Sequence, residues 1–534
     1  MPTVREATFA VLRRHGMTTL YANPGSTEVS LLAGLPDDLS FVLGLHEGSV
    51  VGMATGQAIA TGLPALAILH TTAGLGNAVG AIATARVNRA PLVVIVGQQD
   101  RRHLALEPFL TGKLTGLAGD YPVWTDQPVR AQDVPGAIAR AWHEAITGRG
   151  PALVVVPMDD WLAEMSEDQV LAAPLAVHRP AALPEAGVAE LIAMVAAART
   201  PVLVVGAGAD SQDAWSALVD LADRLGCPVW QESFGARAGF PQDHPLFAGV
   251  LPAGRAQQRE TLDGHDLVLA VGAPVFRHYP YQPGAILTPG TKVAVVTDDP
   301  AEAHRSPADL VLLAPVAAVC ARLAAAVPAS GKTVAPAARQ SPPLPPAVGE
   351  PLRAGHVLAA LAARVAHDVV IVEETPSSRP ELHRLLPARS PMGFVSAAMG
   401  GLGFGLPAAV GIKMGAPGRP VIAVVGDGSA IYGIQALWSA ARYRAGVLFV
   451  VLSNGRYAVM DRLAEANGGG KAPWPAFEEV SISGLAAAFG CPTLRVDSYE
   501  QLLDVLDEVV PSLAGRDEPL LLDVTVAPDP DFRP

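Results

Sequence analysis

Cysteine, aromatic residues and positive charge are all scarce in this sequence. Its 534 residues include only three cysteines, Cys227, Cys320 and Cys491, which lie far apart and have no metal-ligand spacing. A disulfide framework or a zinc cluster is therefore not indicated, and buried thiols in a reducing cytoplasm are expected. The 38 Lys and Arg residues are outnumbered by 51 Asp and Glu residues, which gives a net charge of −13. Nucleic-acid binding is not expected of so acidic a chain, although a locally positive site can still hold an anionic substrate.

Targeting and membrane signals are missing as well. The first residues lack the basic and then apolar pattern of a secretion signal. No apolar run reaches about 18 residues without a charge, Gly or Pro, so no membrane span is predicted. These absences predict a soluble, cytoplasmic protein.

Short apolar runs alternate with helix-length segments along the whole chain. Half of the residues are hydrophobic and only 5% are aromatic, which suits parallel sheets covered by helices. We predict an α/β fold of three doubly wound parallel-sheet domains, at 1–178, 184–328 and 352–534, with a Pro-rich linker at 329–351. The expected strands are Thr18–Tyr21, Phe41–Leu45, Ala65–Leu69, Leu92–Val96, Ala152–Val156, Pro201–Val205, Pro228–Trp230, Leu267–Val271, Lys292–Val296, Val369–Val372, Pro420–Val425, Val447–Leu452, Leu494–Val496 and Pro519–Val524.

The most informative motif is a glycine-rich turn near the C-terminus. The predicted strand Pro420–Val425 leads into Gly426-Asp427-Gly428-Ser429 and then a predicted helix. Glycine lets a ligand approach the backbone, and helix N–H groups can hold phosphate oxygens. Asn454 follows Asp427 by 27 positions, the length of one βαβ unit, so both should lie at one sheet edge. A carboxylate, an amide oxygen and a backbone carbonyl suit Mg²⁺ beside a phosphate; a capped turn is the alternative.

This pair of motifs resembles the signature of the thiamine-diphosphate enzyme family. The resemblance implies pyrimidine-binding, middle and diphosphate-binding domains in that order, with thiamine diphosphate and Mg²⁺ as cofactors. It assigns the metal to Asp427, Asn454 and the backbone carbonyl of Arg456. Leu402 takes the place of the bulky apolar residue under the bent cofactor. Cofactor contacts are implied for Gly25, Ser377, Gly401, Leu402, Gly428, Ser429 and Tyr457.

The N-terminal third carries the residues expected at the other end of the cofactor. Thiamine chemistry needs a carboxylic acid at the pyrimidine ring, and Glu47 stands between a predicted strand and a predicted helix. Ser26 and His70 follow two further strands of the same predicted sheet, so all three should share its carboxyl edge. Without the C-terminal motif, Glu47 is an acid in the first turn of a helix, where the helix dipole favours it.

Over nearly its whole length the chain resembles benzoylformate decarboxylases, the aryl 2-oxo acid members of this family. The resemblance implies that Ser26, His70 and His278 are catalytic along with Glu47. His278 stands one position before the expected place, which Tyr279 occupies, so either residue can reach the site. Leu463 stands where an aromatic residue is expected. The implied substrate pocket is Phe109, Leu110, Tyr279, Val459, Met460 and Leu463.

The implied reaction is non-oxidative decarboxylation of an aryl or branched 2-oxo acid to an aldehyde and CO2. Two alternatives remain open: a carboligase or lyase of the acetolactate synthase or benzaldehyde lyase type, and a catalytically silent cofactor binder, against which the intact Glu47 argues. The resemblance also implies a homodimer or homotetramer with active sites shared between subunits. Gly206-Ala207-Gly208 follows a strand in the middle domain, but we expect no nucleotide there because no acidic residue is recognised at the next strand end.

Overall fold

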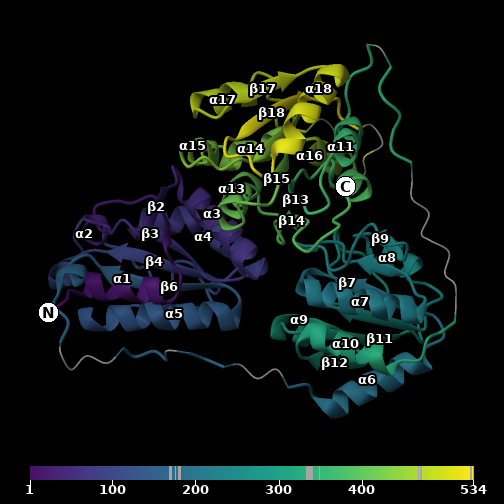
Figure 1. Cartoon of the computed structure of the whole chain (residues 1–534), viewed down its shortest axis with the longest axis horizontal. Helices are drawn as coiled ribbons and strands as arrows, with labels where there is room; N and C mark the ends of the chain where they lie inside the picture. Colours follow the sequence, from purple (N-terminus) through teal and green to yellow (C-terminus); the bar gives the residue numbers. More distant parts are fainter. Residues whose placement is uncertain are drawn as a thin grey trace. The chain divides into compact units, whose positions relative to one another are not determined.

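Three six-stranded parallel sheets with helices on their faces make up the fold (Figure 1). The computed structural model describes residues 1–166, 171–174, 176–178, 182–331, 341–347, 349–466, 468, 472–529 and 532. Among these residues, no helix combines the length and the apolar character needed to cross a bilayer. Ten residues of the predicted linker, at 332–340 and 348, lie outside the described residues.

The first sheet has the strand order β2-β1-β3-β4-β6-β5. The apolar strands β3 and β4 lie at its centre and are almost completely buried, because helices cover both faces. The strands are β1 (Thr19–Ala22), β2 (Ser40–Leu43), β3 (Ala65–His70), β4 (Leu92–Gln98), β5 (Trp124–Asp126) and β6 (Pro151–Pro157). The helices are α1 (Val4–Arg14), α2 (Val29–Leu32), α3 (Glu47–Thr61), α4 (Thr71–Val87) and α5 (Val134–Gly148), with the 3-10 helices η1 (Arg101–Leu106), η2 (Ala131–Asp133) and η3 (Asp160–Leu162).

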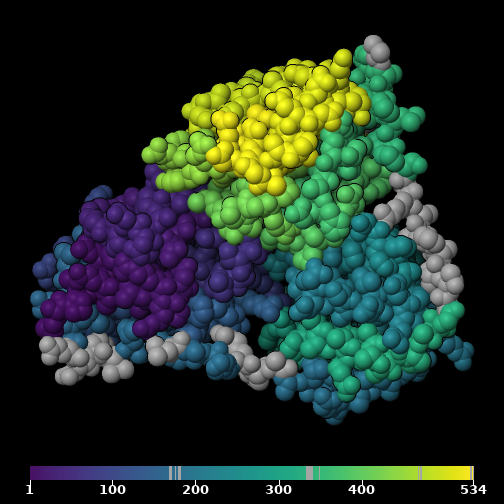
Figure 2. Space-filling model, viewed as in Figure 1, coloured from purple at the N-terminus to yellow at the C-terminus, as the bar shows by residue number. Residues whose placement is uncertain are grey.

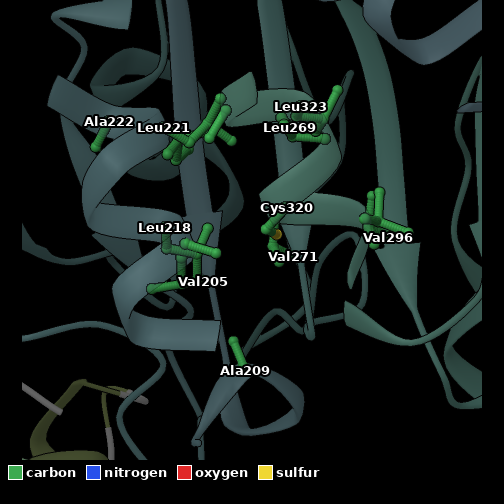
Figure 3. Packing of buried hydrophobic residues seen from close by; sticks show 14 of the residues in the cluster. Val205, Ala209, Leu218, Leu221, Ala222, Leu269, Val271, Val296, Cys320 and Leu323 are labelled. Atoms are coloured by element: carbon green, nitrogen blue, oxygen red, sulfur yellow. The ribbon is translucent and has the colours of Figure 1, made fainter. Parts of the chain in front are cut away.

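The second sheet has the order β12-β11-β10-β7-β8-β9 and its own apolar core. Figure 3 shows Leu218 and Leu221 of one helix packed with Cys320 of another over Val271 and Val296 of the strands. The strands are β7 (Pro201–Val205), β8 (Val229–Gln231), β9 (Phe247–Val250), β10 (Leu267–Val271), β11 (Lys292–Thr297) and β12 (Leu310–Leu313). The helices are α6 (Glu185–Ala197), η4 (Ala207–Ala209), α7 (Gln212–Leu225), α8 (Arg255–Thr261), α9 (Pro300–Arg305) and α10 (Val316–Ala326). All three cysteines of the chain are free and buried, as predicted.

The third sheet has the order β14-β13-β15-β16-β18-β17. In the space-filling view its yellow C-terminal elements pack with the green segment before them into one surface (Figure 2). The strands are β13 (Val370–Glu374), β14 (Phe394–Ser396), β15 (Val421–Gly426), β16 (Leu448–Ser453), β17 (Thr493–Val496) and β18 (Leu520–Thr525). The helices are α11 (Ala354–Ala362), α12 (Arg379–Leu385), α13 (Gly405–Gly415), α14 (Asp427–Gly433), α15 (Ala436–Arg442), α16 (Ala458–Ala466), α17 (Ile482–Ala488), α18 (Tyr499–Val509) and η5 (Val510–Ser512).

The contacts divide the chain into two compact units. Unit 1 comprises Met1–His178, Val372–Ser377 and Ala397–Pro534, and unit 2 comprises Arg179–Ile371 and Ser378–Ser396. Inside unit 1, helices α3 and α13 pack closely along their length. Glycines allow this approach: a Cβ on Gly56 would lie 2.1 Å from the Ala408 carbonyl oxygen, and one on Gly411 would lie 1.9 Å from that of Met53. Unit 1 therefore contains the first sheet and β15 to β18 of the third sheet, together with the last residues of β13.

All fourteen predicted strands are present, and the described residues form four further strands that were not predicted. The four are β5, β9, β12 and β14, and every one of them is the last strand at an edge of its sheet. They are only three or four residues long, and most residues of β5, β9 and β12 are partly exposed. A strand of three or four residues is too short for its pattern to be told from a loop or a helix segment, even where it is apolar throughout, as in β12.

Candidate active site

The carboxyl edge of the first sheet brings three predicted residues to neighbouring strand ends. β2, β1 and β3 are adjacent and parallel. Ser26 follows β1, Glu47 begins the helix after β2, and His70 is the last residue of β3. Ser26 is exposed, His70 is partly buried and Glu47 is buried. The shared edge expected from the sequence is present.

Glu47 is a buried carboxylate held by two amide groups. Asn23 Nδ2 donates a hydrogen bond to its Oε1 at 3.1 Å, and Asn77 Nδ2 donates to its Oε2 at 3.1 Å. Glu47 is the first residue of α3, where the helix dipole favours a negative charge. The side chain of His46 caps the same helix by accepting the Gly48 N–H. Both oxygens of Glu47 are thus held in place on a rigid helix end.

His70 is bound by residues to which the sequence alone assigned no role. Its Nδ1 lies 3.0 Å from Glu28 Oε2 and 3.0 Å from Thr27 Oγ1. Both partners are buried. The available signal was an acid and a hydroxyl directly after Gly25-Ser26 in the first strand–helix loop, but side chains of these types are common in loops.

The carboxyl edge of the third sheet holds Asp427 and Asn454 at the ends of adjacent parallel strands, β15 and β16. Asp427 Oδ2 accepts the N–H groups of Asn454 at 2.8 Å and Gly455 at 2.6 Å, and its Oδ1 accepts that of Gly428. Burial raises the pKa of Asp427 above its usual range, while these N–H donors act to lower it. Backbone N–H groups of both turns therefore donate to one buried carboxylate.

Aromatic rings cover this glycine turn. A Cβ on Gly428 would lie 2.6 Å from the Tyr457 ring, and the rings of Tyr457 and Phe477 are 5.0 Å apart. The Phe477 N–H donates to the Gly455 carbonyl at 2.8 Å, which fixes that segment. Asn454 Oδ1 accepts the Arg456 N–H at 3.1 Å. Of the three predicted metal residues, Asn454 and Arg456 therefore lie in the turn after β16, and Asp427 lies in the adjacent turn after β15.

A second buried carboxylate, Glu374, holds the loop that carries Leu402. Its Oε1 accepts the Gly403 N–H at 2.6 Å, and its Oε2 accepts the Gly405 N–H. Burial raises the pKa of Glu374 to about 7, against the lowering effect of these donors. Leu402 itself is 39% exposed, which leaves the side chain free to meet a ligand. Sequence reasoning missed Glu374 because an acid at the end of a buried strand has no motif.

Five of the six predicted pocket residues lie on two segments of unit 1, and the sixth, Tyr279, belongs to unit 2. Val459, Met460 and Leu463 belong to α16, which has no buried residue. Phe109 and Leu110 lie in the loop after η1, and Phe109 is 87% exposed. Arg462, the one cation on this part of α16, donates to Glu465 at 2.8 Å and to the Asp529 carbonyl at 3.4 Å. Arg462 is therefore engaged by the protein's own oxygens.

In unit 2, one sequence-based statement about the middle domain is wrong. An acidic residue does follow the next strand: Glu232 comes directly after β8. It is occupied, however, because Arg277 donates to both of its oxygens, at 3.2 and 2.8 Å. A Cβ on Gly208 would lie 2.8 Å from Gly272, so neighbouring backbone fills the space beside the glycine turn. The turn thus serves close packing.

His278 and Tyr279 also belong to unit 2. His278 Nε2 lies 2.6 Å from Gln258 Oε1, and burial lowers its pKa. Tyr279 is 55% exposed.

Comparison with known proteins places the chain in a family. The model of the thiamine pyrophosphate enzyme N-terminal TPP binding domain matches residues 2–117, that of the central domain residues 188–323, and that of the C-terminal TPP binding domain residues 377–524. Benzoylformate decarboxylase of Pseudomonas aeruginosa is 39% identical over 539 positions, which cover 98% of this chain and 99% of the relative. The chain belongs to the thiamine pyrophosphate enzyme family.

Two further comparisons narrow its place in this family. The solved structure of Rhodococcus jostii RHA1 thiamine diphosphate-dependent 4-hydroxybenzoylformate decarboxylase has a TM-score of 0.93 and 38% identity, covering 99% of both chains. Acetolactate synthase of Mycobacterium bovis is 27% identical over all of this chain and 89% of its own. The predicted family, three-sheet fold and thiamine diphosphate cofactor are confirmed, and the 2-oxo acid decarboxylase class is favoured over the acetolactate synthase alternative.

Proposed function

We propose that this enzyme removes CO2 from a 2-oxo acid with an aryl or branched apolar tail, such as benzoylformate, and releases the aldehyde. The main support is the 39% identity to a benzoylformate decarboxylase over 98% of the chain. The bond between C1 and C2 of the substrate breaks, C1 leaves as CO2, and C2 gains a proton from the protein or solvent. No oxidant is needed, because the electron pair of the broken bond ends in the new C–H bond.

The residues of the two edges fit thiamine diphosphate. When bound, this cofactor supplies an electron sink for the pair released as CO2 departs. Gly428, whose missing side chain lets Tyr457 lie close, and Ser429 would hold the diphosphate together with Ser377. Gly25 and Gly401 would give backbone access, and Leu402 would support the cofactor from an exposed position.

Mg²⁺ belongs to the same proposal. Asp427, the amide oxygen of Asn454 and the backbone carbonyl of Arg456 form an all-oxygen set of the kind Mg²⁺ prefers. The buried Asp427 carboxylate supports this assignment, because its charge is costly to bury without a cation and its pKa is already raised.

The first edge would handle protons. Glu47 would exchange a proton with the pyrimidine ring of the cofactor, and its two amide donors keep its oxygens in one orientation. His70 would donate to the oxygen that was the substrate carbonyl, and Ser26 would bind the substrate carboxylate. His278 and Tyr279 are both candidates for a further polar contact.

The substrate tail would lie among Phe109, Leu110, Tyr279, Val459, Met460 and Leu463. Because Arg462 is paired with Glu465, this helix offers no free cation for a second carboxylate, which favours an apolar tail. We also propose a homodimer or homotetramer with shared active sites, in the cytoplasm, where the three free thiols stay reduced.

The test is a substrate panel of benzoylformate, a branched-chain 2-oxo acid, pyruvate and 2-oxoglutarate, with CO2 and aldehyde measured separately. We expect kcat/KM to be highest for benzoylformate or the branched acid. A clear preference for pyruvate or 2-oxoglutarate would refute the apolar pocket. A coupled hydroxyketone as the main product would move the enzyme to the carboligase alternative.

A further inference from the structure

Glu28 is a buried carboxylate that the proposed reaction does not yet use. It is 2% exposed and lies in the loop after β1, the strand adjacent to β3, which ends at His70. We propose that Glu28 is the positioning residue of His70: it fixes the imidazole ring and the nitrogen that carries the proton. This inference rests on the proposed role of His70 and extends it to a residue that never touches substrate.

The contacts around Glu28 converge on one geometry. Its Oε2 lies 3.0 Å from His70 Nδ1 and accepts the Gly25 N–H at 2.8 Å. Its Oε1 accepts the Thr27 hydroxyl at 2.5 Å, and the oxygen of that hydroxyl lies 3.0 Å from the same His70 Nδ1. Both carboxylate oxygens are therefore satisfied, and two acceptors face a single ring nitrogen.

The backbone around the pair has glycine where a side chain would destroy it. A Cβ on Gly97, at the end of β4, would lie 1.7 Å from Glu28 Oε1. A Cβ on Gly25 would lie 2.4 Å from His70 Nδ1. The loop after β1 and the end of β4 therefore both leave space for the Glu28–His70 pair, which a surface ion pair would not require.

The chemical consequence follows from what a carboxylate can do. An ionised Glu28 only accepts hydrogen bonds, so Nδ1 must carry a proton and Nε2 is left as the nitrogen that can accept or deliver one. The carboxylate also stabilises the positive charge whenever His70 becomes doubly protonated. Glu28 would therefore act on turnover entirely through His70.

A double-mutant cycle tests this dependence. We compare wild type, Glu28→Gln, His70→Ala and the double variant in decarboxylation of benzoylformate, normalised to bound cofactor. Glu28→Gln should lower kcat/KM by about 10-fold to 10²-fold, the usual cost of losing such a supporting partner. In the His70→Ala background the same change should cost less than about 2-fold, because the partner is already gone.

The control is Asp160→Asn, which removes another buried carboxylate of the same sheet region, one that pairs with Arg101. Its effect should be equal in both His70 backgrounds, because it acts only on stability. If Glu28→Gln behaves like Asp160→Asn, with full and equal losses in both backgrounds, Glu28 is a structural residue and the inference is overturned.

A second measurement needs no substrate and separates this inference from the proposed function. Diethyl pyrocarbonate acylates neutral imidazole, and peptide mapping gives the rate at His70 alone. At alkaline pH we expect slower acylation of His70 in Glu28→Gln, because the ring loses the electron-releasing carboxylate and its fixed orientation. If wild type decarboxylates no 2-oxo acid, the proposed function fails while this rate still decides the role of Glu28; an unchanged rate overturns it.

Discussion

The first and third sheets have one architecture and two chemistries. Counting strands from the start of each region, both sheets follow the order 2-1-3-4-6-5. A functional candidate stands at the end of the third strand of each: His70 is the last residue of β3, and Asp427 directly follows β15. A buried glutamate stands near the end of the first strand of each: Glu28 in the loop after β1, and Glu374 as the last residue of β13. The fold thus supplies the same positions twice, and the residue types decide what each edge can do.

The partners of the two buried glutamates show the difference. Glu28 binds a histidine ring, a hydroxyl and one backbone N–H, so its surroundings can transmit a proton. Glu374 accepts backbone N–H groups of the Gly403–Gly405 turn and holds a loop. We infer that the first edge is built for proton transfer and the third for holding a cofactor.

If the two edges have these separate roles, the largest effect of a substitution should come from the carboxyl edge of the third sheet. Asp427→Ala should weaken thiamine diphosphate binding by more than about 10²-fold, because metal affinity depends strongly on each ligand. Isothermal titration with Mg²⁺ present measures the loss. Asp517→Asn, at a carboxylate that is 63% exposed in the same region, should leave affinity unchanged. Equal affinity of wild type with Mg²⁺ and with EDTA would contradict the metal assignment.

The first edge should respond in turnover instead of binding. Glu47→Gln keeps the size and the hydrogen-bonding reach of the side chain but cannot ionise. We expect kcat to fall by about 10²–10⁴-fold, the range for one acid–base group, with cofactor affinity within a few-fold of wild type. Steady-state kinetics and titration on the same preparation decide it. Wild-type turnover in this variant would remove Glu47 from the mechanism.

The features that the sequence predicts are those encoded by residues close together or regularly spaced along the chain. The central strands and the Asp427–Asn454 pair were predictable, because apolar runs and a fixed βαβ spacing are written along the chain. Edge strand β5 was not, because a short, half-exposed strand carries no such run. Glu28 and Glu374 were also missed, since their significance comes from partners that only folding brings near, such as Gly97.

Glu374 should make stability depend on pH in a direction opposite to that of most carboxylates. Burial raises its pKa from 4.5 to about 7, so the folded state holds a proton that the unfolded state releases. Its contribution is complete below pH 4.5 and is lost as pH rises toward about 7. The loss should be about 3–4 kcal/mol at most. Urea unfolding at several pH values should show this component in wild type and not in Glu374→Gln; identical pH profiles would refute it.

The smallest expected effect concerns α3 and α13, the two helices that occupy equivalent positions in the first and third sheets. α3 follows the second strand of the first sheet and α13 follows the second strand of the third, and the two pack together through glycines. Gly411→Ala places a methyl group 1.9 Å from the Met53 carbonyl oxygen, so backbone must move. We expect destabilisation by about 1–2 kcal/mol.

Gly80→Ala in α4 is the matched control, because a Cβ there meets nothing within 4 Å. It should be neutral or stabilise the protein by about 0.5–1 kcal/mol, since alanine loses less entropy than glycine in a helix. Urea midpoints of the two variants, measured against wild type, give the comparison. Similar midpoints for Gly411→Ala and Gly80→Ala would mean that the two helices can separate at little cost. The association of the first and third sheets would then depend on other contacts, such as the hydrogen bond from the Ala398 N–H to the Asn88 side chain at 2.8 Å.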